Sequence, residues 1–276
     1  NLALPPTKAL LSVSLGWAGQ GLVDKGLFRV DEVDYSWFPR RLTLRAKGAP
    51  VSQTLGTKKE RSWHGKTLGV IAITIAKEHG LKPMISGMLK DLVIDHIDQT
   101  NESDINFLTR IAKLNDAICT VKSERLLLTP TNACTSVSGK AIPEQTIVLS
   151  DQDTGHYHSD DRSRYTGVRA YWHDPGASRR KSVLAGTDSQ VKSLRQTFPS
   201  KADAERAAKA EFKRIKRGSA TLTLALDKGR PTLMPETPFR VRGIKSEVDA
   251  ERWVVMKVTH NLNDSGYACN IEAESR

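Results

Sequence analysis

The residues best suited to metal or acid–base chemistry lie in one short polar segment. His156 and His158 are two positions apart, so on a strand their side chains would lie on the same face. Asp160 follows them with a carboxylate that could complete a metal site. The neighbouring Thr, Gly and Ser residues are instead typical of a solvent-exposed loop. We therefore expect an exposed loop here, with no bound metal and no cofactor.

Other catalytic and nucleotide-binding patterns are incomplete. Residues 65–67 read Gly-Lys-Thr, like the end of a phosphate-binding loop, but Glu60 occupies the position of the first glycine that such a loop requires. The chain contains neither a Gly-x-Ser-x-Gly nucleophile elbow nor a His-Glu-x-x-His zinc motif. Cys119, Cys134 and Cys269 are far apart and odd in number, as expected of buried thiols. These features predict that the protein is not an enzyme.

The composition is that of a globular protein with roughly two domains. The 276 residues are 38% hydrophobic and 26% charged, which is too apolar for a disordered chain. No stretch has the roughly 18 uncharged apolar residues of a membrane helix, so we expect no membrane-spanning segment. Collagen, membrane channels and disulfide-stapled scaffolds are excluded. Because the chain opens with Asn1 rather than methionine, we expect a fragment or a processed product.

Positive charge is concentrated in one region. The formal net charge is +11, and residues 176–217 hold 12 basic and 4 acidic side chains, so most of the excess lies there. Such a region favours an anionic partner, with nucleic acid as the obvious candidate. It contains only two aromatic residues for base stacking, Phe198 and Phe212, and a solvated helix surface explains it equally well. The candidate contacts for an anionic partner are Arg179, Arg180, Lys181, Lys213, Arg214, Lys216 and Arg217.

The hydrophobic pattern changes along the first half of the chain. Residues 10–47 alternate between apolar and polar, the period-two pattern of half-buried strands. Helical spacing follows over residues 66–79 and 105–115, the first ended by Gly80 and the second capped by Asn101 or Ser103. A hairpin is predicted from two short apolar runs that flank a polar turn, 117–121 and 125–129.

The second half is again mostly strands. Short alternating segments with Gly and Pro turns predict an antiparallel barrel or sandwich. One helix interrupts them over residues 201–217, with Ser200 as its cap, Asp203 in a weak capping box and Gly218 as its stop. Basic residues in its last turn complement the helix dipole, so part of the basic region has a structural reason.

One segment resembles a known protein family. Residues 96–112 are similar to the Q-x-x-E-S-D-x-x-F-L-x-R-L-A segment of the phage late control D proteins, the tail hub family of contractile-tailed phages. The hub-like N-terminal part of type VI secretion spike proteins carries a similar segment. Trp63 precedes the segment, Trp253 and His260 follow it, and the likeness runs from about residue 25 to residue 275. The matching positions within it are His96, Asp98, Gln99, Glu102, Ser103, Asp104, Phe107, Leu108 and Arg110.

The resemblance implies a structural role for all these residues and a non-enzymatic hub. Members of the family have two β-barrel domains with a smaller module between them. Three copies form a ring of six barrels that adapts a hexameric tail tube to a trimeric spike. The implied partners are two further copies of the chain, the tail tube protein, the spike protein and other baseplate proteins, with a lumen for tape-measure protein or DNA. The implied location is the virion tail baseplate, after assembly in the bacterial host cytoplasm; phage, tailocin and secretion apparatus remain open.

The expected fold class is therefore mainly β with an α+β insertion: two antiparallel, tail-hub-like β-barrel domains separated by a small α/β module. Residues 1–50 would be the C-terminal part of the first barrel, whose N-terminal strands are missing. Residues 51–140 would form the module. Residues 141–276 would form the second barrel, with the helix 201–217 inserted in it.

Overall fold

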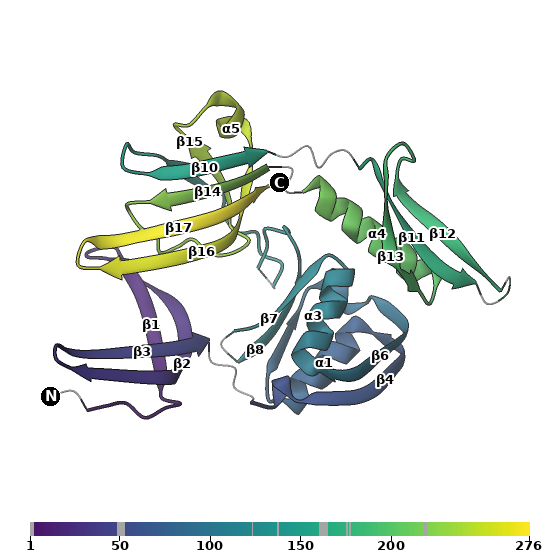
Figure 1. Cartoon of the computed structure of the whole chain (residues 1–276), viewed down its shortest axis with the longest axis horizontal. Helices are drawn as coiled ribbons and strands as arrows, with labels where there is room; N and C mark the ends of the chain where they lie inside the picture. Colours follow the sequence, from purple (N-terminus) through teal and green to yellow (C-terminus); the bar gives the residue numbers. More distant parts are fainter. Residues whose placement is uncertain are drawn as a thin grey trace.

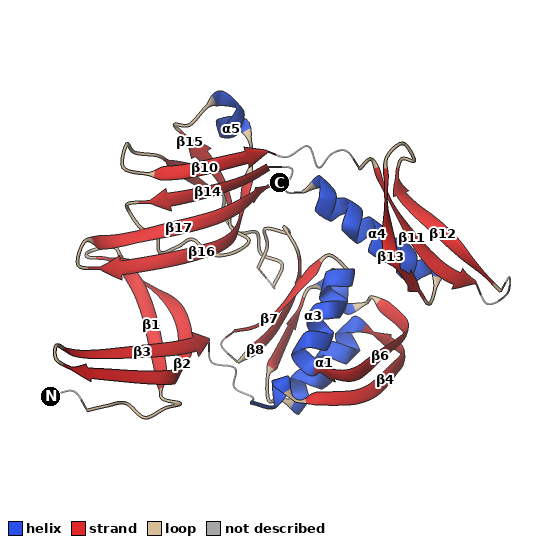
Figure 2. Cartoon of the chain, in the orientation of Figure 1, coloured by secondary structure: helices blue, strands red, loops and turns tan. Residues whose placement is uncertain are grey.

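The computed structural model describes residues 3–48, 53–122, 124–136, 138–159, 165–174, 176, 178–217 and 220–276. Strands make up most of its regular structure, which confirms the mainly β fold class (Figure 2). They form separate sheets, and the α-helices lie in three places along the chain: α1 to α3 within residues 68–114, α4 at Lys201–Lys216 and α5 at Ser246–Ala250 (Figure 1).

The first sheet is a three-stranded antiparallel meander. Its strands pair in the order β1-β2-β3, and they are β1 (Leu10–Trp17), β2 (Gly21–Trp37) and β3 (Arg40–Gly48). Contacts with the C-terminal strands hold one end of it. The Trp17 indole donates a hydrogen bond to the carbonyl of Gly229 at 2.9 Å, and its ring lies 5.5 Å from that of Tyr267. Lys25 Nζ donates to the carbonyl of Pro231 at 2.6 Å.

A compact α/β module follows. Its elements are η1 (Gln53–Gly56), β4 (Lys58–Thr67), α1 (Leu68–Glu78), β5 (Lys82–Ile85), α2 (Gly87–Lys90), β6 (Val93–Ser103), α3 (Asp104–Leu114), β7 (Ala117–Lys122) and β8 (Arg125–Pro130). Strands β4 and β6 form one sheet, and β5-β8-β7 form another. Helices α1 and α3 lie between the two sheets (Figure 1). Ile71, Ile75, Phe107, Leu108 and Leu128 are fully buried in the core that results.

The helices of the module begin and end near the predicted residues. Thr67 caps α1 by accepting the Val70 N–H at 3.2 Å, and the helix starts at residue 68 because Lys66 still pairs with β6. Gly80 ends it with a φ of 66°, a conformation that favours glycine. Ser103, rather than the alternative Asn101, caps α3.

The largest sheet has six strands. In pairing order they are β10 (Thr154–Ser159), β14 (Ala220–Leu226), β17 (Gly266–Ser275), β16 (Trp253–Asn263), β15 (Pro238–Arg242) and β9 (Gln145–Val148). The pairing is antiparallel except between β9 and β15, which are parallel. The short helix α5 (Ser246–Ala250) precedes β16. Ile147, Leu222, Phe239, Trp253 and Ile271 fill the core on one face of this sheet.

A third unit lies within the chain of this sheet, between β10 and β14. It consists of β11 (Gly167–Asp174), β12 (Arg179–Gly186), β13 (Val191–Phe198) and α4 (Lys201–Lys216). The sequence placed these strands in the second barrel, but they form a sheet of their own, ordered β12-β11-β13, with β13 parallel to β11. Val168 and Ala170 pack against Ala204 and Ala208 of α4, whose small side chains allow close approach to the sheet.

Helix α4 itself matches its prediction closely. Ser200 caps it and accepts the N–H of Asp203 at 3.2 Å. The predicted stop at Gly218 lies outside the described residues. None of the helices in the described ranges is both long and apolar enough to cross a bilayer.

Replacing Phe107 by alanine should destabilise the protein by about 3–5 kcal/mol, because a ring with no exposed surface would leave a cavity in the module core. Urea unfolding monitored by tryptophan fluorescence measures this change. The control Val70→Ala removes a side chain on the exposed face of α1 and should change the unfolding free energy by less than about 0.5 kcal/mol. Equal stability of the two variants would contradict the assignment of this core.

Candidate functional site

The centre of the family-like segment is the carboxylate of Asp104, which is completely buried at the start of α3. Lys59 Nζ donates to it at 2.7 Å and Gln99 Nε2 at 2.8 Å. Arg61 forms an ion pair with Oδ1 of Asp104. His79 Nε2 lies 2.7 Å from Oδ2. Donors from three elements, β4, the end of α1 and β6, therefore meet at one anion.

Two further groups complete this network. Glu78 accepts from Lys59 and from Arg61, each at 2.8 Å, so the two cations face two carboxylates. Thr54 Oγ1 lies 2.7 Å from the second ring nitrogen of His79. We refer to Thr54, Lys59, Arg61, Glu78, His79, Gln99 and Asp104 together as the Asp104 network.

The electrostatics of the network favour the ionised carboxylate. Burial alone would raise the pKa of the Asp104 carboxyl. The hydrogen bonds from its neighbours and the positive charge of Arg61 outweigh burial, and its pKa falls to about 2. The pKa of Glu78 is also lowered, since hydrogen bonds and charges from Lys59 and Arg61 together outweigh its burial.

The other residues of the segment hold α3 against β6. Gln99 accepts from Arg61 Nε at 2.9 Å and donates to the carbonyl of Glu102 at 2.8 Å. Arg110 reaches back from α3 to the Glu102 carboxylate at 2.8 Å and to the carbonyl of Asp98 at 2.7 Å. These contacts make the segment a structural clamp.

The apolar residues of the segment lie beneath this clamp. Trp63 stacks on Phe107 with ring centroids 6.5 Å apart, and the Arg61 guanidinium lies 5.1 Å from the centroid of Trp63. Leu108 is fully buried beside them. His96 and Asp98 instead lie on the opposite, exposed face of β6.

Two more predicted positions lie in the six-stranded sheet. Trp253 is fully buried, donates to the carbonyl of Val248 at 3.3 Å and meets the ring of Tyr157 edge-on. His260 Nδ1 lies 2.8 Å from the Tyr267 hydroxyl. Burial, with a smaller effect of Lys25, lowers the pKa of His260.

The predicted metal candidates lie on a strand rather than in the expected loop. His156 and His158 are exposed residues of β10, which pairs along its length with β14, and this pairing explains the difference. Their ring centroids are 6.4 Å apart. Asp160 lies outside the described residues.

Within the described residues, a different group of ligand-type atoms lies close enough to hold a metal: Glu78, His79 and Asp104. Lys59 and Arg61 already donate to both carboxylates of this group. Two cations in these positions oppose a third, so the arrangement fits an ion-pair network better than a metal centre.

Most of the basic candidates have partners within the chain. Lys181 pairs with Asp174, and Arg180 lies over the ring of Tyr171. At the end of α4, Lys216 lies 4.8 Å from the centroid of Phe212. The other candidates there are Lys213, which is exposed, Arg214, which pairs with Glu211, and Arg217, which pairs with Asp116. Arg179 is exposed at the start of β12. This pairing disfavours a nucleic-acid interface.

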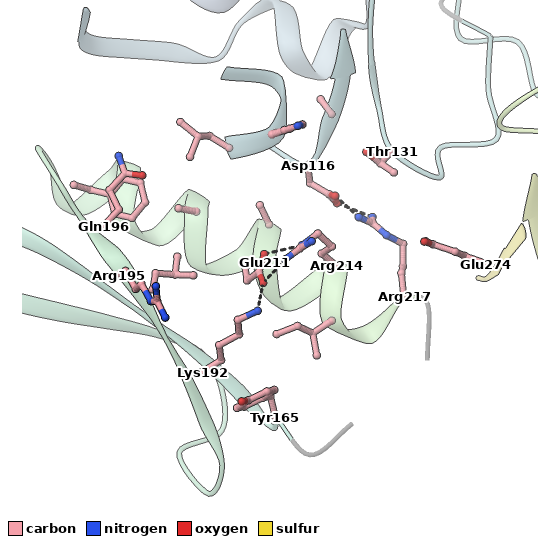
Figure 3. A pocket seen from close by; sticks show the side chains of 18 of the residues that line it. Asp116, Thr131, Tyr165, Lys192, Arg195, Gln196, Glu211, Arg214, Arg217 and Glu274 are labelled. Carbon is pink, nitrogen blue, oxygen red and sulfur yellow. Dashed lines mark hydrogen bonds and ion pairs between the residues drawn. The ribbon is translucent and has the colours of Figure 1, made fainter. Parts of the chain in front are cut away.

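The structure also contains a cleft that the sequence did not indicate. It lies between α4, β13 and the end of α3 (Figure 3). Its volume is about 1200 Å³. Glu211 accepts from Lys192 at 2.7 Å and from Arg214 at 2.8 Å inside it. Arg217 Nη1 crosses it to Asp116 at 2.6 Å, so the cleft lies where the inserted unit joins the module. The two partners are 101 residues apart, so no local pattern in the sequence could indicate this cleft.

Replacing Asp104 by asparagine should destabilise the fold by about 3–5 kcal/mol at pH 7, because two partly buried cations lose the fully buried anion that they share. The folded-state pKa lies below the usual value, so this stabilisation is present above about pH 5 and is lost as pH falls towards 2. Urea unfolding at several pH values should therefore show the wild type and Asp104→Asn converging in acid. The exposed control Asp34→Asn should follow the wild type throughout; a gap independent of pH would contradict the network's electrostatic role.

Comparison with known proteins supports these observations. A family model described as "Phage tail baseplate hub (GPD)" matches residues 13–266. The probable baseplate hub protein of Escherichia phage 186 is 36% identical over 315 residues, covering 99% of this chain and 81% of that protein.

Solved structures show the same fold. The tail protein from Neisseria meningitidis MC58 superimposes with a TM-score of 0.68 at 16% identity, over 92% of this chain and 82% of that one. The E. coli c3393 protein gives 0.53 at 12% identity, over 95% of this chain and 63% of that one. That protein is a component of the type VI secretion system and is structurally similar to the T4 bacteriophage tail proteins gp27 and gp5. Because the family model covers most of the chain and a phage relative is 36% identical to it, the chain belongs to the phage tail baseplate hub family.

Proposed function

We propose that the protein is the structural hub of a contractile tail, in which three copies form a ring that adapts the hexameric tail tube to the trimeric spike. It turns over no substrate in this role. The observation that carries the proposal is the family match over residues 13–266, because it includes strands of every sheet and helices α1 to α5.

The architecture supports a ring of this kind. The chain has two main sheets outside the module, β1-β2-β3 and the six-stranded sheet, joined through Trp17 and Lys25. With domains at residues 1–50, 51–140 and 141–276, three copies would present six sheet domains to a sixfold tube. If the rotation that relates neighbouring copies closes after three steps, the copies form a ring in which every contact is identical.

Two exposed aromatic side chains support a contact surface at the β2–β3 turn. Trp37 and Phe38 at this turn are 66% and 91% exposed. Large apolar side chains gathered at one turn are typical of a protein interface. We call Trp37 and Phe38 the aromatic tip, and we assign it to contact with another copy or another baseplate protein.

The remaining parts of the proposal concern place and neighbours. The hub would be part of the virion tail baseplate of a phage or a tailocin and would be assembled in the cytoplasm of the bacterial host. Its neighbours would be the tail tube protein, the spike protein and other baseplate proteins. The lumen of the ring would let tape-measure protein or DNA pass.

Sedimentation velocity of the chain, alone and with its spike protein, tests the ring. We expect a species of three copies in the mixture, and electron micrographs viewed down its axis should show threefold symmetry. A chain that stays monomeric at high concentration in the presence of the spike would refute the proposal.

The double variant Trp37→Ser, Phe38→Ser should raise the protein concentration needed for assembly at least tenfold, because the interface loses two large apolar side chains. Its unfolding free energy as a monomer should stay within about 0.5 kcal/mol of the wild type, since both side chains are exposed. The matched control Met88→Ser replaces a 78% exposed apolar residue on α2 and should assemble normally. Normal assembly of the double variant would exclude the aromatic tip from the interface.

A further inference from the structure

A pair of histidines faces solvent on the outer side of the module. His64 on β4 and His96 on β6 occupy directly opposite positions in the antiparallel pairing. Their ring centroids are 4.5 Å apart with 28° between the ring planes, and the two Nδ1 atoms are 2.9 Å apart. Both residues are exposed, so an ion from solution can reach the two nitrogens.

The neighbouring side chains fix the orientation of one ring. His96 Nε2 donates to Asp98 Oδ2 at 3.1 Å, and the Ser62 hydroxyl donates to the other oxygen of Asp98 at 2.6 Å. A proton held on Nε2 leaves the lone pair of His96 Nδ1 directed at His64. A carboxylate that orients an imidazole in this way is the usual outer partner of a metal-binding histidine.

One proton between the two Nδ1 atoms accounts for their separation without a metal. His64 then donates from Nδ1 to the lone pair of His96. If the His64 proton moves to its Nε2, both Nδ1 lone pairs become available to one cation. A metal ion thus replaces a single proton at this position.

The separation selects the geometry of the ion. With metal–nitrogen bonds of about 2.0–2.1 Å, nitrogens 2.9 Å apart subtend about 90° at the ion. This is the angle between neighbouring ligands in tetragonal Cu²⁺ or octahedral Ni²⁺ complexes. Tetrahedral Zn²⁺ would need the nitrogens about 3.3 Å apart. We propose that His64 and His96 form a cross-strand chelate for a divalent transition-metal ion, Cu²⁺ or Ni²⁺, with Asp98 as the positioning residue.

Other candidate groups fit a metal less well. The atoms of Glu78 and Asp104 already accept from Lys59 and Arg61. His156 and His158 lie on one strand, with ring centroids 6.4 Å apart rather than 4.5 Å. This second histidine pair offers a matched control on the same chain.

Titration of the full chain with Cu²⁺, followed by calorimetry and electron paramagnetic resonance, tests the proposal. We expect one strong site whose spectrum shows two nitrogen ligands, and weaker binding of Zn²⁺ than of Cu²⁺. His64→Gln and His96→Gln should each weaken Cu²⁺ binding at least tenfold. Asp98→Asn should weaken it about tenfold while keeping both nitrogens in the spectrum.

The control variant His156→Gln, His158→Gln should bind Cu²⁺ like the wild type. All substituted side chains are exposed, and unfolding curves identify any variant that fails to fold. Unchanged affinity in both His64→Gln and His96→Gln would overturn the proposal, as would loss of the strong site in the control. Unchanged Cu²⁺ affinity in Asp98→Asn alone would show that Asp98 is not a positioning residue of the site. None of these results depends on assembly of a ring.

Discussion

The arrangement of the module depends on a buried anion. A carboxylate with no exposed surface, such as Asp104, costs several kcal/mol unless charged and polar donors replace its water. Those donors come from β4, the end of α1 and β6, so these elements must meet at the start of α3. Glu78 balances the second cation, and the cluster of Lys59, Arg61, Glu78 and Asp104 carries no net charge. This requirement explains why a motif of charged and polar residues lies at the start of α3.

The same principle explains part of the basic region, because several of its cations join parts of the chain. Arg217 links the end of α4 to Asp116 beside α3, and Arg206 donates from α4 to the carbonyl of Val93 at 3.1 Å. Lys192 and Arg214 share Glu211 within the inserted unit. The positions of these cations are therefore set by partners within the chain.

Local signals in the sequence were sufficient for the three longest helices, α1, α3 and α4, and for the hairpin at residues 117–130. Each has a periodic apolar face and a definite cap or turn, both encoded within a few residues. The partners of Asp104 could not be found this way, since Lys59 is 45 positions away. The separate sheet of the inserted unit was also missed, because alternation shows that a segment is a strand but does not show which strand it joins.

Strand register connects the buried network with the exposed histidines. The β4–β6 pairing shifts by one residue between Lys59 and Arg61, where Asn101 adopts a φ of 47°. Such a bulge adds one residue to one strand and re-aims the side chains beyond it. With this register Arg61 and Trp63 point to the core, while His64 points to solvent opposite His96. A slip of one residue would exchange these two faces, so the register that satisfies Asp104 is also the one that brings the two imidazoles together.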